Sequence, residues 1–390
     1  MPLSRNKEFK IILLIVAVTL LYLSGYLAKF DWNPSATIIL GEKHFARFEQ
    51  KIGLTLDNLV VFKDRQYDGL YYYGLALDPQ CSDLCAGKNA KEVIMRVERV
   101  VYPLLAFWLS FGRRALLPMA LILINLLALA GSSFLLLRFL EKYRADPRLV
   151  YLWGFGVGAI LCLTRDLPFL LMFFFILAAL FCLDRKKNFL ASGLFLLAML
   201  TGEIALSVIA PVVLFLALKK KWRAATIVSL SLVAYAGWQW LLALRFGAAP
   251  MFMITGQMTW PLWGFVGFFN DLFQNWDARH LILASGSLLV ILFVLFQVYL
   301  LLKYWPRTLT LNLTVLLSQI LMMLSLGPVL LGGGIDNLGR YAQGLFLFSI
   351  LYTAEAGEKY SRFLISLTVY LSVTYLSALL LGFNPAYFIS

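Results

Sequence analysis

The sequence predicts an all-α polytopic membrane protein, a single domain of residues 1–390 with about eleven transmembrane helices. Hydrophobic residues make up 61% of the chain and charged residues only 14%, whereas soluble domains carry about 25% charged residues. The apolar runs are continuous, as in membrane-spanning helices, and lack the alternation of barrel strands. The net charge of +13 falls on one predicted side of the membrane. It therefore indicates topology and contacts with anionic membrane lipids, and no nucleic-acid partner.

The first apolar run, residues 11–28, follows Arg5, Lys7 and Lys10. This basic flank places the N-terminus in the cytoplasm, and the run is expected to be retained as an anchor because it lacks an obvious cleavage site. A span needs about 20 apolar residues, and ten further runs reach or approach that length. They are residues 115–140, 149–164, 167–183, 188–201, 204–218, 224–245, 281–302, 308–327, 341–354 and 363–382.

The loops between these runs differ in charge. Each short loop assigned to the cytoplasm is rich in lysine and arginine, as at 185–187 and 219–221, which follows the positive-inside rule. The polar segments 29–114 and 247–280 then become the first and second extracytoplasmic loops. An odd number of spans leaves the C-terminus outside. The short loops favour a bacterial inner membrane.

The first extracytoplasmic loop contains the stretch 66–79, in which Asp68 stands among tyrosines and glycines. Tyr-Asp-Gly is a common turn sequence, and a plain turn is one interpretation. A binding site is the other, because tyrosines offer apolar faces with hydroxyl tips that suit an amphipathic ligand. The ligand-binding candidates around this aspartate are Tyr67, Tyr71, Tyr72 and Arg65.

Three other features belong to the two outer loops. Cys81 and Cys85 can form a short disulfide if the loop lies in an oxidising compartment, and their spacing alone is too weak to predict zinc. The run 102–109 is too short to cross a bilayer, so we expect an amphipathic helix in the membrane interface. The aromatic residues of 247–280 predict either an interfacial belt or a wall for a lipid tail.

Charged residues from distant parts of the chain stand at the outer ends of the predicted spans. Asp166 and Glu203 either cap helices or contact a substrate or a metal, and a carboxylate at membrane depth is usually paired. Arg340, followed by Tyr341, either holds a phosphate bidentately or pairs with Asp336 or with lipid headgroups. All of these residues are expected at one membrane face.

The glycines at 154, 156 and 158 form Gly-x-Gly-x-Gly inside an apolar run. A dinucleotide-binding fingerprint needs a preceding strand, and none is predicted there. Close packing between helices explains these glycines better.

Several of these elements together resemble the GT-C glycosyltransferases, and look most like bacterial relatives of the mannosyltransferases of GPI-anchor assembly. The resemblance rests on Tyr-Asp-Gly-x-Tyr-Tyr at 67–72 within the segment 66–79, and on Tyr-Pro-Leu-Leu-Ala within 99–112. Weaker similarity lies at 201–223 and 337–345. As architecture it covers nearly the whole chain.

The resemblance implies transfer of a sugar from a polyprenyl-phosphate donor to a lipid or glycan acceptor on the outer face, usually with inversion. Asp68 matches the catalytic aspartate of the family's first outer loop. Many relatives have two adjacent acids there, whereas Tyr67 precedes Asp68 here, which leaves dependence on Mg²⁺ or Mn²⁺ open. In chemical terms, a carboxylate can take the acceptor's proton. A cation such as Arg340, Arg65 or a metal can stabilise the leaving phosphate.

Two other classes of protein remain as alternatives. A transporter or flippase of lipid-linked glycans needs a polar path through the helices, and few charges stand at mid-membrane depth. A non-catalytic assembly subunit would use the first outer loop as a docking surface.

Overall fold

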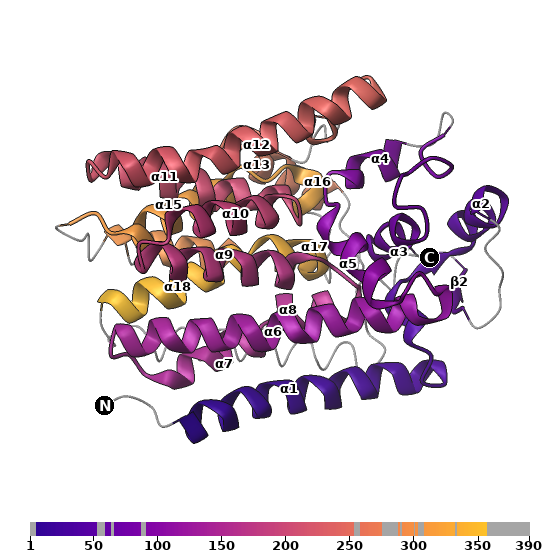
Figure 1. The fold of residues 1–390 in the computed structure, drawn as a ribbon, viewed down its shortest axis with the longest axis horizontal. Coiled ribbons are helices and arrows are strands. Elements are labelled where there is room, and N and C mark those ends of the chain that lie inside the picture. Colours follow the sequence, from indigo (N-terminus) through magenta and orange to yellow (C-terminus); the bar gives the residue numbers. More distant parts are fainter. Residues whose placement is uncertain are drawn as a thin grey trace.

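The computed structural model confirms the mainly helical fold class. The helices lie roughly side by side, and a group of short elements gathers at one end of the bundle (Figure 1). The only named strands among the described residues are β1 (Leu40–Gly41) and β2 (Val61–Phe62), which pair in parallel with Leu40 opposite Val61. The structure describes residues 5–52, 59–63, 66–86, 91–252, 258–274, 288, 291–299, 301–302, 308–331 and 334–356.

Three described helices are long and apolar enough to cross a membrane: α1 (Arg5–Leu27), α6 (Leu117–Lys142) and α12 (Trp222–Phe246). Proline in the first turn of α6 needs no helical hydrogen bond to its nitrogen. The last, α12, ends at Gly247, whose φ of 80° is the left-handed conformation of a helix C-terminus.

A fourth candidate span is broken into two helices. The segment expected as one span at 149–164 folds as η4 (Pro147–Leu149), α7 (Val150–Gly154) and α8 (Val157–Thr164), with a bend of 42°. The number of spans by length and composition is therefore three, or up to four, within the described residues. The expected eleven spans are not confirmed.

Shorter helices make up the rest of the bundle. Apolar helices that are too short for a full span include α9 (Phe169–Asp184), α10 (Asn188–Met199) and α15 (Leu311–Leu324). The predicted span 363–382 lies outside the described residues, as does much of 281–302. The helices are α9 (Phe169–Asp184), α10 (Asn188–Met199), η5 (Glu203–Ala205), α11 (Leu206–Leu218), α15 (Leu311–Leu324), α16 (Pro328–Leu331), α17 (Gly334–Tyr341) and α18 (Gln343–Ala356).

The first predicted outer loop folds into short helices at one end of the bundle, on the right in Figure 1. The interfacial run expected at 102–109 is a helix, and it exposes Leu104, Trp108 and Leu109. The elements of this loop are η1 (Ala28–Phe30), η2 (Pro34–Thr37), α2 (Glu42–Ile52), α3 (Gly69–Leu77), α4 (Lys91–Val97), α5 (Val101–Leu109) and η3 (Arg114–Leu116).

The second predicted outer loop, 247–280, contains η6 (Pro250–Phe252) and α13 (Trp263–Gln274) among its described residues. Its aromatic side chains divide between the two sides of α13. Trp263 and Phe273 are exposed, whereas Phe268 is buried. Exposed aromatic residues on one face suit either interpretation of this loop, a belt or a wall for a lipid tail.

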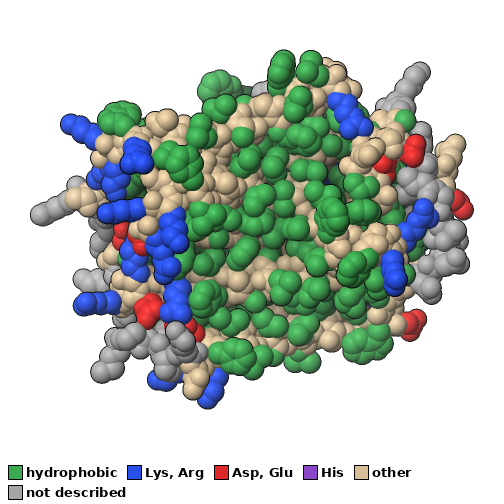
Figure 2. Space-filling model, in the orientation of Figure 1, with side chains coloured by type: hydrophobic (Ala, Val, Ile, Leu, Met, Phe, Trp, Pro, Cys, Tyr) green, Lys and Arg blue, Asp and Glu red, His purple; other side chains and the backbone are tan. Residues whose placement is uncertain are grey.

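Charged groups separate to the two ends of the bundle. At one end, the side chain of Arg138 on α6 donates to Glu8 of α1 at 2.8 and 2.9 Å, and Lys142 pairs with Asp184 at the end of α9 at 2.5 Å. Lysine and arginine side chains gather at this end, on the left in Figure 2, and hydrophobic side chains cover the middle. This arrangement agrees with a membrane protein whose basic end was expected in the cytoplasm.

The glycine pattern at 154–158 reflects close packing, as expected. A Cβ at Gly154 would lie 2.6 Å from the side chain of Ile15 on α1, and a Cβ at Gly158 would lie 2.1 Å from Gln343 on α18. Any larger residue would push these helices apart.

Candidate functional site

Asp68 lies at the N-terminal boundary of α3, at the end of the bundle opposite the basic one. Its Oδ1 accepts hydrogen bonds from Nη2 and Nε of Arg96 at 2.5 and 3.2 Å, and its Oδ2 accepts one from Nη1 of Arg340 at 2.7 Å. Nη1 of Arg99 lies 4.0 Å from Oδ2. Three guanidinium groups from separate parts of the chain therefore surround one carboxylate. We call Asp68, Arg96, Arg99, Arg340 and Glu203 the arginine–carboxylate cluster.

Gly69, the residue after Asp68, allows the start of α3 to approach neighbouring backbone closely. A Cβ at Gly69 would lie 2.5 Å from the backbone oxygen of Arg165 and 3.0 Å from that of Ile38. Both neighbours are backbone atoms, which cannot rotate away. The sequence Tyr-Asp-Gly is a turn that leads directly into α3, and α3 begins against the residues between α8 and α9. The side chain of Asp68 does not cap this helix.

Opposing effects set the acidity of Asp68. Burial raises the pKa of its carboxyl group, but the charges of Arg96, Arg340 and Arg99 outweigh burial and hold the pKa below the usual range. The side chain is 13% exposed. Asp68 is therefore an ionised acceptor for guanidinium groups, and it is a weak base while both Arg96 and Arg340 donate to it.

Glu203 joins the cluster through Arg99, as part of the expected gathering of outer charges. Nε and Nη2 of Arg99 donate to the two carboxylate oxygens of Glu203 at 2.7 and 2.6 Å, which is the bidentate geometry typical of arginine. Nη1 of Arg99 donates to the hydroxyl of Tyr72. Glu203 stands in the first turn of η5 after the residue pair Thr201-Gly202, and the partners of its carboxylate include both the guanidinium of Arg99 and a backbone nitrogen of this first turn.

The three tyrosine candidates hold arginines in position. Tyr72 is fully buried and accepts from Arg99, and Tyr71, 4% exposed, donates to Glu92 at 2.6 Å. The guanidinium of Arg96 lies 4.1 Å from the centre of the Tyr71 ring. The guanidinium of Arg340 lies 5.6 Å from the Tyr67 ring. Cation–π contacts of this kind stabilise the arginine side chains by about 1 kcal/mol or more when water is excluded.

The remaining candidates differ in their relation to the cluster. The Tyr341 ring lies 5.1 Å from the guanidinium of Arg340 and 6.5 Å from the ring of Phe169. The carboxylate of Asp166 accepts from Thr37 at 2.7 Å and is fully buried. Burial raises the pKa of Asp166 well above the usual range, and its contact with Thr37 joins the turn after α8 to η2. Arg65 lies outside the described residues, as does the side chain of Asp336.

Arg96 and Arg99 were not predicted as site residues. Arg96 lies in the last turn of α4, and Arg99 follows between α4 and α5, shortly before the run 102–109. The available signal was a pair of arginines three residues apart, shortly before the predicted interfacial run 102–109. Arg340 adds a further donor, since its buried Nε has no hydrogen-bond partner among the described residues.

The donor set around Asp68 does not fit a divalent metal. Its nearest described neighbours are guanidinium groups, which donate hydrogen bonds and do not ligate cations. No group of three or more histidine, cysteine, aspartate or glutamate side chains that could hold a metal lies within the described ranges. What the cluster can hold is an anion, because arginine forks match phosphate oxygens.

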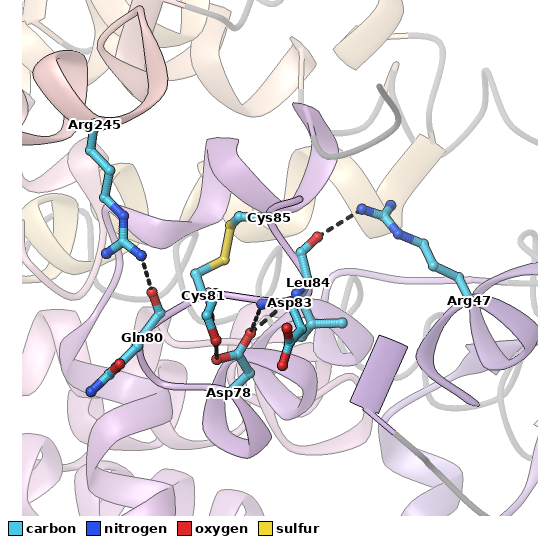
Figure 3. The surroundings of a disulfide bond; sticks show 9 residues. Arg47, Asp78, Gln80, Cys81, Asp83, Leu84, Cys85 and Arg245 are labelled. Atoms are coloured by element: carbon cyan, nitrogen blue, oxygen red, sulfur yellow. Dashed lines mark hydrogen bonds between the residues drawn. A yellow bond between two sulfur atoms is a disulfide. The ribbon is translucent and has the colours of Figure 1, made fainter. Parts of the chain in front are cut away.

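A disulfide stabilises the far end of α3. Cys81 pairs with Cys85, and the carboxylate of Asp78 accepts from the backbone nitrogens of residues 82–84 (Figure 3). Arg245, at the end of α12, donates to the backbone oxygen of Gln80 at 2.6 Å. Arg47 of α2 donates to that of Leu84 at 2.9 Å. Helix α3, which follows Asp68, is thus attached to α2 and α12 at its C-terminal end.

Comparisons with protein-family models, with curated proteins and with solved structures found no match. The class defined by fold and site is a helical membrane protein with an arginine–carboxylate cluster at one end of the bundle.

Proposed function

We propose that the protein is a glycosyltransferase of the GT-C type, which transfers a sugar from a polyprenyl-phosphate donor to a lipid or glycan acceptor on the extracytoplasmic face of a bacterial inner membrane. The observation that supports this most is the position of Asp68 between Arg96 and Arg340, 2.5 and 2.7 Å away. The cluster lies at the end of an apolar bundle, where a lipid phosphate would stand. The opposite, basic end would face the cytoplasm.

The arginines supply what the leaving group requires. When the bond between the anomeric carbon and the phosphate oxygen breaks, negative charge grows on the phosphate. Preorganised donors stabilise such charge most strongly where water is excluded. Arg340 has an unused buried Nε–H among the described residues, and Arg96 is held in place by Tyr71 and Asp68. The hydrophobic side chains that cover the middle of the bundle in Figure 2 suit a polyprenyl chain.

The same arginines control the base. The acceptor hydroxyl attacks the anomeric carbon and gives its proton to Asp68, which is a weak base while two guanidinium groups donate to it. The phosphate of an incoming polyprenyl-phosphate sugar competes with Asp68 for these guanidinium groups. As Arg96 and Arg340 turn to the phosphate, the pKa of Asp68 rises toward its ordinary range. The carboxylate therefore becomes a competent base only when the polyprenyl-phosphate sugar is bound.

The proposal is tested with purified protein and radiolabelled polyprenyl-phosphate sugars. We expect turnover by the wild type, and a loss of about 10²- to 10⁴-fold in Asp68→Asn, the usual contribution of a general base. Arg340→Gln should raise KM for the donor and lower kcat. Arg340→Lys should recover only part of both, because lysine keeps the charge and loses the fork. Wild-type turnover in Asp68→Asn would refute the proposal. Turnover of the polyprenyl-phosphate sugar by this purified chain alone would exclude the alternative of a non-catalytic assembly subunit.

A further inference from the structure

A second carboxyl group adjoins the cluster. Glu98 stands between α4 and α5 and is fully buried. Its Oε2 accepts from the hydroxyl of Tyr235 at 3.1 Å and from Nε2 of Gln239 at 2.5 Å, both on α12. Its Oε1 is buried and has no hydrogen-bond partner among the described residues. A buried carboxylate with an unused oxygen and no cation in direct contact is costly, whereas a neutral acid is not.

The charges near Glu98 also favour its neutral form. In the described part of the chain, the groups that face it are Arg99 beside it, Glu203 from η5, and Tyr235 and Gln239 from α12. Arg99 is already committed to both oxygens of Glu203. Burial and then the negative charge of Glu203 raise the pKa of Glu98 to about 7, against the opposing effects of Arg99 and the two hydrogen bonds.

We infer that Glu98 is a positioning residue for Arg99. While Glu98 is neutral, the guanidinium of Arg99 stays bonded to Glu203 and Tyr72 and faces Asp68. When Glu98 ionises, the cluster binds an anion more weakly. The inference deepens the proposed function and rests on it, since it concerns regulation of the same site. An ionised Glu98 would compete with Glu203 for Arg99 and pull the guanidinium toward α12. It would also add a negative charge near any bound phosphate.

The test measures binding of inorganic sulfate to the full-length protein in detergent, by calorimetry at several values of pH between about 5.5 and 8.5. Sulfate stays a dianion over this range, so its own charge does not change as that of a phosphate would. The variants are wild type, Glu98→Gln as a permanent neutral mimic, and Asp184→Asn as a matched loss of one carboxylate at the opposite end. Infrared pH-difference spectra of the same samples would show whether a protonated carboxyl disappears.

We expect the Kd of wild type and Asp184→Asn for sulfate to rise about tenfold as pH increases through 7. The direction follows from repulsion between the added negative charge on Glu98 and the bound dianion. Glu98→Gln should keep the low-pH affinity throughout and lack the titrating carboxyl band. All other titratable groups are shared by wild type and Glu98→Gln, so the difference between their curves isolates Glu98.

Identical pH curves for wild type and Glu98→Gln would overturn the inference, and so would the absence of sulfate binding at any pH. If Glu98→Gln does not fold, Tyr235→Phe serves instead. It removes a hydrogen bond that lowers the pKa of Glu98, so the midpoint should move upward, and an unchanged midpoint would count against the inference. Sulfate binding with the expected pH dependence, together with no turnover of any polyprenyl donor, would reject the proposed function while supporting the role of Glu98.

Discussion

Replacement of Asp68 by Asn removes the carboxylate that accepts from Arg96 and Arg340 but preserves the shape of the side chain. The carboxylate is 13% exposed and the two arginines 16% and 10%, so water compensates little for its loss. Removing one partner of a buried ion pair costs about 3–5 kcal/mol. Because Asn retains one acceptor oxygen and the site has some exposure, we expect a loss of about 2–3 kcal/mol in the free energy of unfolding.

The assay is the apparent melting temperature of the purified protein in detergent, with and without sulfate. Without sulfate, Asp68→Asn should melt several degrees below wild type, because Arg96 and Arg340 then lose their carboxylate partner. Sulfate should stabilise the variant more than the wild type, since an anion can replace the missing charge. At 100 times the Kd, a ligand of the folded state adds about 2.7 kcal/mol.

Asp184→Asn is the matched control. It breaks the pair with Lys142, in which both side chains are 45% exposed, and such surface pairs contribute under about 1 kcal/mol. Two results would refute the reasoning about the cluster: an Asp68→Asn protein as stable as wild type, or equal stabilisation of both by sulfate.

Three other predictions follow from the described contacts. Reduction of the disulfide between Cys81 and Cys85 should lower stability by about 2 kcal/mol, as the chain-entropy relation gives for so short a loop, and melting with and without reductant measures it. Gly69→Ala should cost about 1–3 kcal/mol, because its Cβ would stand 2.5 Å from the backbone oxygen of Arg165; an unchanged melting temperature would contradict this contact. Glu98 has a raised pKa in the folded state, so that state binds more protons than the unfolded chain between about pH 4.5 and 7. Its contribution to stability therefore falls by about 3 kcal/mol as pH rises across that window, and denaturation at several pH values should show a flatter profile for Glu98→Gln.

The helical class and the separation of charges between the two ends could be predicted from the sequence. Both follow from one-dimensional patterns, the length of apolar runs and the location of basic loops. Asp68, Glu203 and Arg340 were expected at one face because topology alone placed them there, and the structure brings these three together. Asp166 was expected with them, but its described hydrogen bond is to Thr37.

The partners within the site could not be predicted in the same way. Arg96 and Arg99 reach the cluster because α4 forms and packs beside α3, and the sequence analysis predicted no helix at α4, which lies within the predicted loop 29–114. The burial of Tyr72 depends on packing across the loop, since its ring lies edge-on to Tyr102 of α5 at 5.6 Å. The break between α7 and α8 was missed because both halves are apolar, and composition does not reveal a bend at a glycine.

The central claim is that this chain cleaves a polyprenyl-phosphate sugar at a site that contains Asp68. The most direct measurement follows radiolabelled donor in proteoliposomes that contain wild type or Asp68→Asn, each with and without chelator. The account predicts that label leaves the donor only with wild type, and that chelator has no effect, because guanidinium groups serve the leaving phosphate. Label that crosses the bilayer with its donor bond intact, equally in both proteins, would contradict the account and identify a transporter.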